Sequence, residues 1–300
     1  MQESRWRDPR WLTQAYEWID ARVDRTGTIE QSHVRPWSTV LRVPTGAGPV
    51  WFKATDESLR HEAGLVELLS RRRPAEVPPP LAVERERGWL LMSDGGETLR
   101  AVTARERSLE RWHDVLARYA RVQLATAGDV DALLALGVPD RRLARLPAAY
   151  RELVARVGAG RRFQDAAARV DELCAELDAY GIAELIQHDD LHDAQVFVRD
   201  GRHLILDWGD ACVTHPFLSL SVPLEGTLAW GLDDVEGSVD TGPFRDAYLR
   251  PFAESYAGDL VAAARVALRL GWVCRAINGH VPGDDAQTLT RLRMFLDGRP

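Results

Sequence analysis

The segment that most constrains the fold is residues 186–210, IQHDDLHDAQVFVRDGRHLILDWGD. Within it, two short apolar runs, Gln195–Arg199 and His203–Trp208, flank the dipeptide Asp200-Gly201. Asp-Gly between apolar runs is the strongest short-range signal for a β-hairpin, because both turn positions require a positive φ. The sequence therefore predicts two paired strands joined by a two-residue turn.

Three polar residues stand at the ends of this predicted hairpin. Asp190 precedes the first strand, Gln195 begins it, and Asp207 ends the apolar run LILD. A carboxylate at the end of an apolar strand is costly unless something binds it, and a divalent cation is the usual partner. The spacing is similar to that of kinases, in which H-x-D-x₄-N supplies a base and a metal ligand and D-F-G supplies the main metal carboxylate.

HDDLHDAQ followed by ILDWGDA resembles a motif pair of the aminoglycoside phosphotransferase family, HGDLHxxN and (I/L)DFxxA. That family is the small-molecule branch of the protein-kinase-like fold. Asp189 stands where the family usually has Gly, and Gln195 stands where it usually has Asn. A Gln in place of this Asn resembles the motif of the maltokinase-like sugar kinases in the same superfamily.

The resemblance implies an α+β, bilobal, protein-kinase-like fold. Its small amino-terminal lobe has an antiparallel sheet, and its larger carboxy-terminal lobe is mainly helical. The stop at Gly95-Gly96 divides the chain into a nucleotide-binding lobe with a leading helix, 1–94, and a catalytic and substrate-binding lobe, 95–300. The apolar strand before it resembles the hinge of kinases, so we expect Met92 and Asp94 to lie near the adenine of a nucleotide.

The remaining nucleotide contacts are expected in the amino-terminal lobe. Lys53, in the strand-like run VWFKA, is the only lysine in the chain, and Glu62 follows on a predicted helix. By resemblance these two form the ion pair that grips the α and β phosphates of ATP in kinases. No GxGxxG is present; the segment 31–39 is the candidate phosphate loop, with Ser38 as its expected contact.

Hydrophobic periodicity predicts the other elements. Apolar residues at three- and four-residue spacing predict helices over about 8–24, 59–70, 109–123, 164–180 and 260–277, and strand-like runs occupy 33–43 and 50–54. We interpret the inward faces of these helices as core.

Charge and composition argue against several functions. A net charge of −7 disfavours binding to nucleic acid or to anionic membranes. The chain opens without an apolar signal region and contains no run of 18 apolar residues. Its three cysteines, Cys174, Cys212 and Cys274, are far apart and without metal-ligand spacing, so we expect buried free thiols and a cytoplasmic location.

The resemblance implies transfer of the γ-phosphoryl group of ATP or GTP to a hydroxyl of a small molecule. Asp190 would orient that hydroxyl and accept its proton, and Asp207 and Gln195 would hold Mg²⁺. Candidate acceptors are aminoglycosides, amino sugars, sugars and amino alcohols. A cationic acceptor would contact acidic residues of the carboxy-terminal lobe, and the candidates are Glu225, Asp233, Asp234, Glu236, Asp240, Asp284 and Asp285.

Two other interpretations are open. A metallohydrolase would require a metal site made by His188, Asp190, His192 and Asp207, and nothing else in the chain supports one. The departures at Asp189 and Gln195 keep open a nucleotide-binding pseudokinase with a scaffold role. Retention of the four residues Lys53, Glu62, Asp190 and Asp207 argues against it. The sequence leaves the acceptor, the choice of ATP or GTP, and the oligomeric state open.

Overall fold

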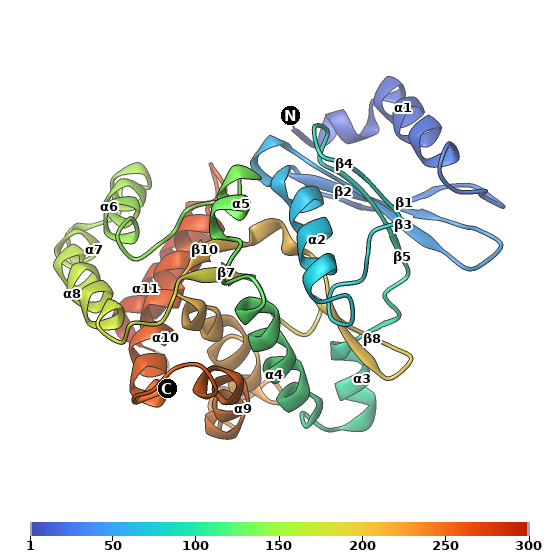
Figure 1. Ribbon diagram of the computed structural model, residues 1–300. Coiled ribbons are helices and arrows are strands. Elements are labelled where there is room, and N and C mark those ends of the chain that lie inside the picture. The colour runs from blue at the N-terminus through green and yellow to red at the C-terminus, as the bar shows by residue number, and fades with distance from the viewer. Residues whose placement is uncertain (1, 299–300) are drawn as a thin grey trace. The chain divides into compact units, whose positions relative to one another are not determined.

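A computed structural model describes residues 2–298 of the chain. It contains two compact units (Figure 1). The amino-terminal unit comprises the chain up to Gly96 together with Arg199–Gly209, and the carboxy-terminal unit comprises Glu97–Val198 and the chain from Asp210 onward. The chain therefore passes from one unit to the other three times.

The amino-terminal unit is built on a five-stranded antiparallel sheet with strand order β1-β2-β3-β5-β4. Its strands are β1 Glu30–Val34, β2 Ser38–Val43, β3 Val50–Thr55, β4 Ala82–Glu84 and β5 Trp89–Ser93. In the central strand β3, Lys53 lies opposite Val40 on one side and Leu90 on the other. The strand that carries the only lysine is therefore paired along both edges.

One strand prediction was wrong. The run 33–43 is not a single strand, because the chain turns between β1 and β2. Arg35 and Ser38 close this turn, with the Arg35 N–H donating to the Ser38 carbonyl at 2.8 Å. Pro36 lies inside the turn, where its missing N–H costs no ladder hydrogen bond.

Helices α1, Pro9–Asp20, and α2, His61–Arg72, pack on opposite faces of this sheet, as the two sides of β3 show. On the first face, the ring of Trp18 in α1 lies 5.6 Å from that of Phe52 and 5.7 Å from that of Trp89. Such aromatic pairs each contribute about 0.5–1.5 kcal/mol beyond the area they bury. Lys53 follows Phe52 on the strand and so points to the face of α2.

The carboxy-terminal unit is mainly helical. Its helices are α3 Leu99–Glu106, α4 Arg111–Leu124, α5 Val130–Ala135, α6 Leu146–Arg156, α7 Arg161–Asp165, α8 Ala167–Asp178, α9 Gly242–Ala253, α10 Leu260–Asn278 and α11 Asp285–Asp297. The predicted helices over 109–123, 164–180 and 260–277 correspond to α4, α8 and α10. Within residues 2–298, no helix combines the length and the apolar character needed to cross a lipid bilayer.

Two short strand pairs position the polar loops of this unit. Strand β7, Leu185–Gln187, pairs with β10, Cys212–Thr214, and β6, Glu97–Thr98, pairs with β8, Val196–Arg199. The next strand, β9 Arg202–Ile205, follows β8 across a turn in which Asp200 and Gly201 have φ angles of +50° and +73°. These angles are those of the predicted Asp-Gly hairpin, which is confirmed.

Candidate functional site

Lys53 lies at the centre of a charge cluster in the amino-terminal unit. Its ammonium Nζ donates to Glu62 Oε1 at 2.7 Å and to Asp207 Oδ1 at 2.6 Å. Burial opposes the charge of Lys53, but Asp207 and Glu62 outweigh this effect and raise its pKa above the usual value. The lysine is therefore a fixed, buried cation at neutral pH. The structure thus brings Lys53 and Glu62 together with Asp207, which lies 154 positions after Lys53 in the sequence.

The backbone around Asp207 explains how the carboxylate reaches this position. Asp207 follows β9 with a φ of +61°, in the left-handed region, and its side chain is about half exposed, at 47%. The next residues form a short 3₁₀ turn, Trp208–Asp210, in which the ring of Trp208 is fully buried. The buried indole anchors the segment while the carboxylate remains accessible to an ion or a ligand.

The other expected nucleotide contacts lie in the same unit. Ser38 is buried at the start of β2, and Met92 is half-buried on β5 opposite Trp51. The carboxylate of Asp94 accepts a hydrogen bond from the indole of Trp51 at 2.8 Å. Their contact with a nucleotide stays a prediction.

In the carboxy-terminal unit, the loop after β7 carries His188, Asp189 and Asp190. The buried His188 braces this loop: its backbone N–H donates to Tyr119 Oη at 2.8 Å, and its Nδ1 accepts from the Asp190 N–H at 3.4 Å. Asp190 follows the buried Asp189 and is itself only partly buried. The loop therefore presents one of its two carboxylates while holding the other inside.

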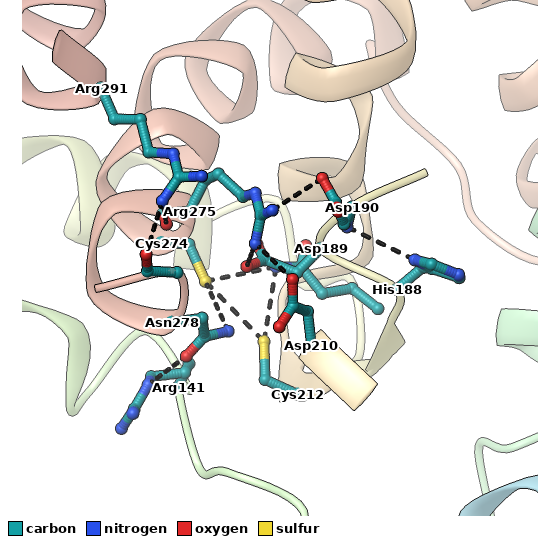
Figure 2. Close-up of polar contacts among 12 residues, drawn as sticks. Arg141, His188, Asp189, Asp190, Asp210, Cys212, Cys274, Arg275, Asn278 and Arg291 are labelled. Carbon is teal, nitrogen blue, oxygen red and sulfur yellow. Dashed lines mark hydrogen bonds and ion pairs between the residues drawn. The ribbon is translucent and has the colours of Figure 1, made fainter. Parts of the chain in front are cut away.

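Arg275 of α10 ties three carboxylates together (Figure 2). Its Nη2 lies 2.7 Å from Asp190 Oδ1, and its Nη1 lies 2.8 Å from Asp210 Oδ2 and 3.6 Å from Asp189 Oδ2. Although Arg275 is nearly buried, this carboxylate cluster raises its pKa above the usual value. Sequence reasoning missed this residue; the one available signal was Asp189, an extra carboxylate that needs a cation if buried.

Asp189 occupies a position suited to glycine. Its φ is +64°, a conformation that glycine adopts freely and that Asp and Asn tolerate better than other residues. Its Oδ1 accepts from Gln187 Nε2 at 2.7 Å, and burial raises its pKa from 3.8 to about 7 in spite of Arg275. Asp189 thus adopts a backbone conformation that favours glycine and adds a buried acid to the loop.

Asp189→Asn is expected to stabilise the protein at pH 8. Between pH 4 and 7 the folded state binds more protons at Asp189 than the unfolded state, so wild-type stability falls as pH rises through this window, by about 4 kcal/mol at most. The Asn side chain of the variant does not ionise, so the variant does not lose this stability as the pH rises. Denaturant unfolding at pH 5 and pH 8 measures it, with Asp200→Asn as an exposed control that also has a positive φ. A less stable Asp189→Asn variant at pH 8 would contradict the expectation.

The buried cysteines also meet near this loop. All three cysteines are free and buried, as predicted. Cys212 and Cys274 lie with their sulfurs 3.8 Å apart, and with Asp189 they form the one group of metal-binding type found in residues 2–298. Gln187 Nε2 lies within hydrogen-bond distance of Asp189 Oδ1, at 2.7 Å, and of the two sulfurs, at 3.4 and 3.2 Å, so the side-chain amide occupies the centre of this group.

The alternative of a metallohydrolase gains no support from the described residues 2–298. His188, Asp190 and His192 share the carboxy-terminal unit but do not form a metal-binding group there. His192 Nδ1 accepts from the Ala194 N–H at 3.1 Å, and its Nε2 lies 3.8 Å from Asp190 Oδ2. His192 thus lies beside Oδ2 of Asp190, whereas Arg275 contacts Oδ1.

Gln195 closes the same loop. Its backbone N–H donates to the His192 carbonyl at 2.9 Å, while its side-chain amide makes no hydrogen bond with the described residues 2–298. The amide is half-buried and available as an oxygen ligand.

Asp190 and His192 line a cavity of about 690 Å³ that lies wholly within the carboxy-terminal unit. Three tryptophans, Trp112, Trp230 and Trp272, also line it. Of the seven acidic residues that the sequence offered for a cationic acceptor, only Asp234 is in its wall. Two of the others already have partners: Glu225 accepts a hydrogen bond from the indole of Trp272, and Asp233 forms an ion pair with Arg107.

Comparisons with known proteins agree with this fold. The model of the phosphotransferase enzyme family, APH, matches residues 8–263. Among solved structures, a choline/ethanolamine kinase family protein from Mesorhizobium loti superposes with a TM-score of 0.64 at 13% identity, covering 94% of each chain. Macrolide 2′-phosphotransferase MphH from Brachybacterium faecium gives a TM-score of 0.57 at 17% identity, covering 97% of this chain and 99% of that one.

A ternary complex of APH(2″)-IIa with streptomycin and ATP gives a TM-score of 0.61 at 13% identity, covering 95% of this chain and 96% of that one. At these identities the likeness establishes the fold, and the predicted α+β, protein-kinase-like architecture is confirmed. The motif resemblance is confirmed by the family match, whereas the meaning of Gln195 stays a prediction. No curated protein matches the chain.

Proposed function

Because the chain belongs to the phosphotransferase enzyme family, APH, we propose that it transfers the γ-phosphoryl group of ATP or GTP to a small-molecule hydroxyl. The observation that carries this proposal is the contact of Lys53, the only lysine, with both Glu62 and Asp207. Kinases hold the triphosphate with a lysine that is paired with a glutamate, and with an aspartate that binds the metal. Ser38, Met92 and Asp94 are further proposed nucleotide contacts.

We assign Asp190 to the acceptor hydroxyl. One carboxylate oxygen, Oδ1, is fixed by Arg275 at 2.7 Å, and Asp190 also lines the cavity. A hydroxyl in the cavity can therefore hydrogen-bond to Asp190 and transfer its proton to it. Such transition states are loose, so positioning of the hydroxyl matters more than the strength of the base.

The donor chemistry fits magnesium, although the two proposed ligands lie in different units. Asp207 offers a half-exposed carboxylate and Gln195 an amide oxygen, and Mg²⁺ prefers such hard oxygen ligands. Bound with the nucleotide, Mg²⁺ would neutralise negative charge on the β and γ phosphates. The side chain of Gln195 would break no hydrogen bond on becoming a magnesium ligand, because it makes none with residues 2–298.

The cavity supports an acceptor the size of a sugar or a small glycoside. Its volume of about 690 Å³ lies in the usual range for small-molecule sites, roughly 300–1,000 Å³. Trp112, Trp230 and Trp272 contribute apolar atoms to its wall, with Trp112 and Trp272 themselves almost fully buried, while Asp190 and His192 supply polar groups. A mainly apolar wall with a few polar groups suits a small molecule that bears hydroxyls.

Turnover of Mg-ATP with a panel of acceptors tests the proposal. The panel includes streptomycin, kanamycin, a macrolide, choline, ethanolamine, glucose, glucosamine and gluconate, and mass spectrometry detects a gain of one phosphate. We expect phosphorylation of at least one acceptor and none without nucleotide. Binding of ATP without turnover of any acceptor would instead favour the scaffold interpretation.

A further inference from the structure

Four of the six Asp and Arg side chains that line the cavity form ion pairs with one another. The wall contains three carboxylates and three arginines. Asp190 is held by Arg275 at 2.7 Å, and Asp193 is held by Arg100, also at 2.7 Å. The cavity therefore has no cluster of unpaired carboxylates, and a polycationic acceptor would have to displace an arginine to reach most of them.

Arg291 of α11 is the exception among the arginines. It lines the cavity, yet it forms no ion pair with a carboxylate anywhere in residues 2–298. Its Nη1 donates to the Gly279 carbonyl at 2.8 Å and to the Arg275 carbonyl at 3.4 Å, at the end of α10. The Nε and Nη2 groups make no hydrogen bond with the described residues and are available to a ligand.

Gly279 makes room for this arrangement. A β-carbon at Gly279 would collide with Nη1 of Arg291 and lie 3.0 Å from Nη1 of Arg275, so glycine leaves space for both guanidinium groups, which lie side by side in Figure 2. Burial and the neighbouring Arg275 lower the pKa of Arg291 to about 10, so the surroundings disfavour its charge. An anion placed against Arg291 would relieve this penalty with charge-assisted hydrogen bonds.

We propose that the acceptor carries an anionic oxygen group, a carboxylate or a phosphate, which binds Arg291 while a hydroxyl of the same molecule reaches Asp190. The inference rests on the proposed function for the role of the hydroxyl. A hydroxy acid or a sugar phosphate has the required combination. Asp234, the remaining carboxylate of the wall, would also pair with one cationic group of the acceptor, such as the ammonium of an amino acid or an amino-sugar acid.

The helix-capping bonds give Arg291 a structural role too, and the experiment must separate the two roles. Calorimetry without nucleotide measures binding of gluconate, glucose 6-phosphate, glucose and glucosamine to the full chain. The variants are Arg291→Lys, which retains the charge, Arg291→Met, and Arg293→Met, an exposed arginine of the same helix, as control. Thermal unfolding of each variant monitors the structural contribution.

We expect at least one of the two acids to bind wild type at least 10-fold more tightly than glucose or glucosamine. Arg291→Met should remove this preference, Arg291→Lys should retain part of it, and Arg293→Met should not change it. Preference for gluconate identifies a carboxylate, and preference for glucose 6-phosphate identifies a phosphate. Failure of both acids to bind more tightly than glucose, or a preference that survives in a folded Arg291→Met variant, overturns the inference.

The outcome is independent of turnover. Phosphorylation of a neutral or cationic acceptor, with no preference for acids, would support the proposed function and overturn the inference. Binding of an acid through Arg291 without phosphorylation of any hydroxy acid would support the anion site and count against the proposed function.

Discussion

Asp190→Asn is expected to lower kcat by about 10²–10⁴-fold while leaving the Kd for Mg-ATP nearly unchanged. Asn retains an oxygen that can accept from Arg275, so the loop keeps its anchor, but it cannot accept the proton of an acceptor hydroxyl. Nucleotide binding should persist because the Lys53 cluster belongs to the other unit of the chain. Single-turnover kinetics with the acceptor found in the panel, together with ATP titration, measure both quantities.

Asp193→Asn provides the matched control for this variant. Asp193 also lines the cavity and is also held by an arginine, Arg100, so its replacement changes the local charge by the same amount. We expect a smaller effect on kcat than at Asp190. Activity of Asp190→Asn within a factor of five of wild type would exclude Asp190 as the proton acceptor.

Lys53→Met is expected to affect both stability and catalysis. Lys53 and Glu62 are almost completely buried, with side-chain exposures of 10% and 3%, so removal of the cation leaves an uncompensated carboxylate inside the unit. Breaking a buried pair in this way typically costs about 3–5 kcal/mol. We also expect kcat/KM for ATP to fall steeply, because the phosphates lose their lysine contact. Denaturant unfolding and steady-state kinetics give the two results.

The double variant Lys53→Met, Glu62→Met separates these effects. Replacing both charges by apolar groups of similar size removes the buried carboxylate, and most of the stability should return. Activity should not return, because no cation faces the nucleotide. Recovery of activity in the double variant would show that Lys53 acts only through stability.

The sequence was most informative where the signals are local. The turn Asp200-Gly201, the strand that precedes Asp207 and the position of Lys53 on β3 all follow from short patterns of residue type and spacing. Two breaks were missed: the turn at Pro36 lies between two runs that both have strand character, and a turn at Ala166 divides the helix expected over 164–180 into α7 and α8.

The arginines of the site could not be predicted in the same way. Arg275 meets Asp210 across 65 residues of sequence, and it lies on a helix whose apolar pattern indicates only core. Arg291 is one of many arginines, and its lack of a carboxylate partner among residues 2–298 is visible only when its neighbours are placed. Long-range pairing of charges leaves no periodic pattern, which is why these residues required the structure.

The three passages of the chain between the units have a consequence for how the protein is made. The amino-terminal unit is completed only by Arg199–Gly209, so a ribosome must synthesise more than two-thirds of the chain before Lys53 can meet Asp207. A gene fragment that stops at Gly96 would encode the sheet but leave out this aspartate. The protein is therefore unsuited to division at Gly96 into independently expressed halves, and its nucleotide cluster must assemble late in biosynthesis.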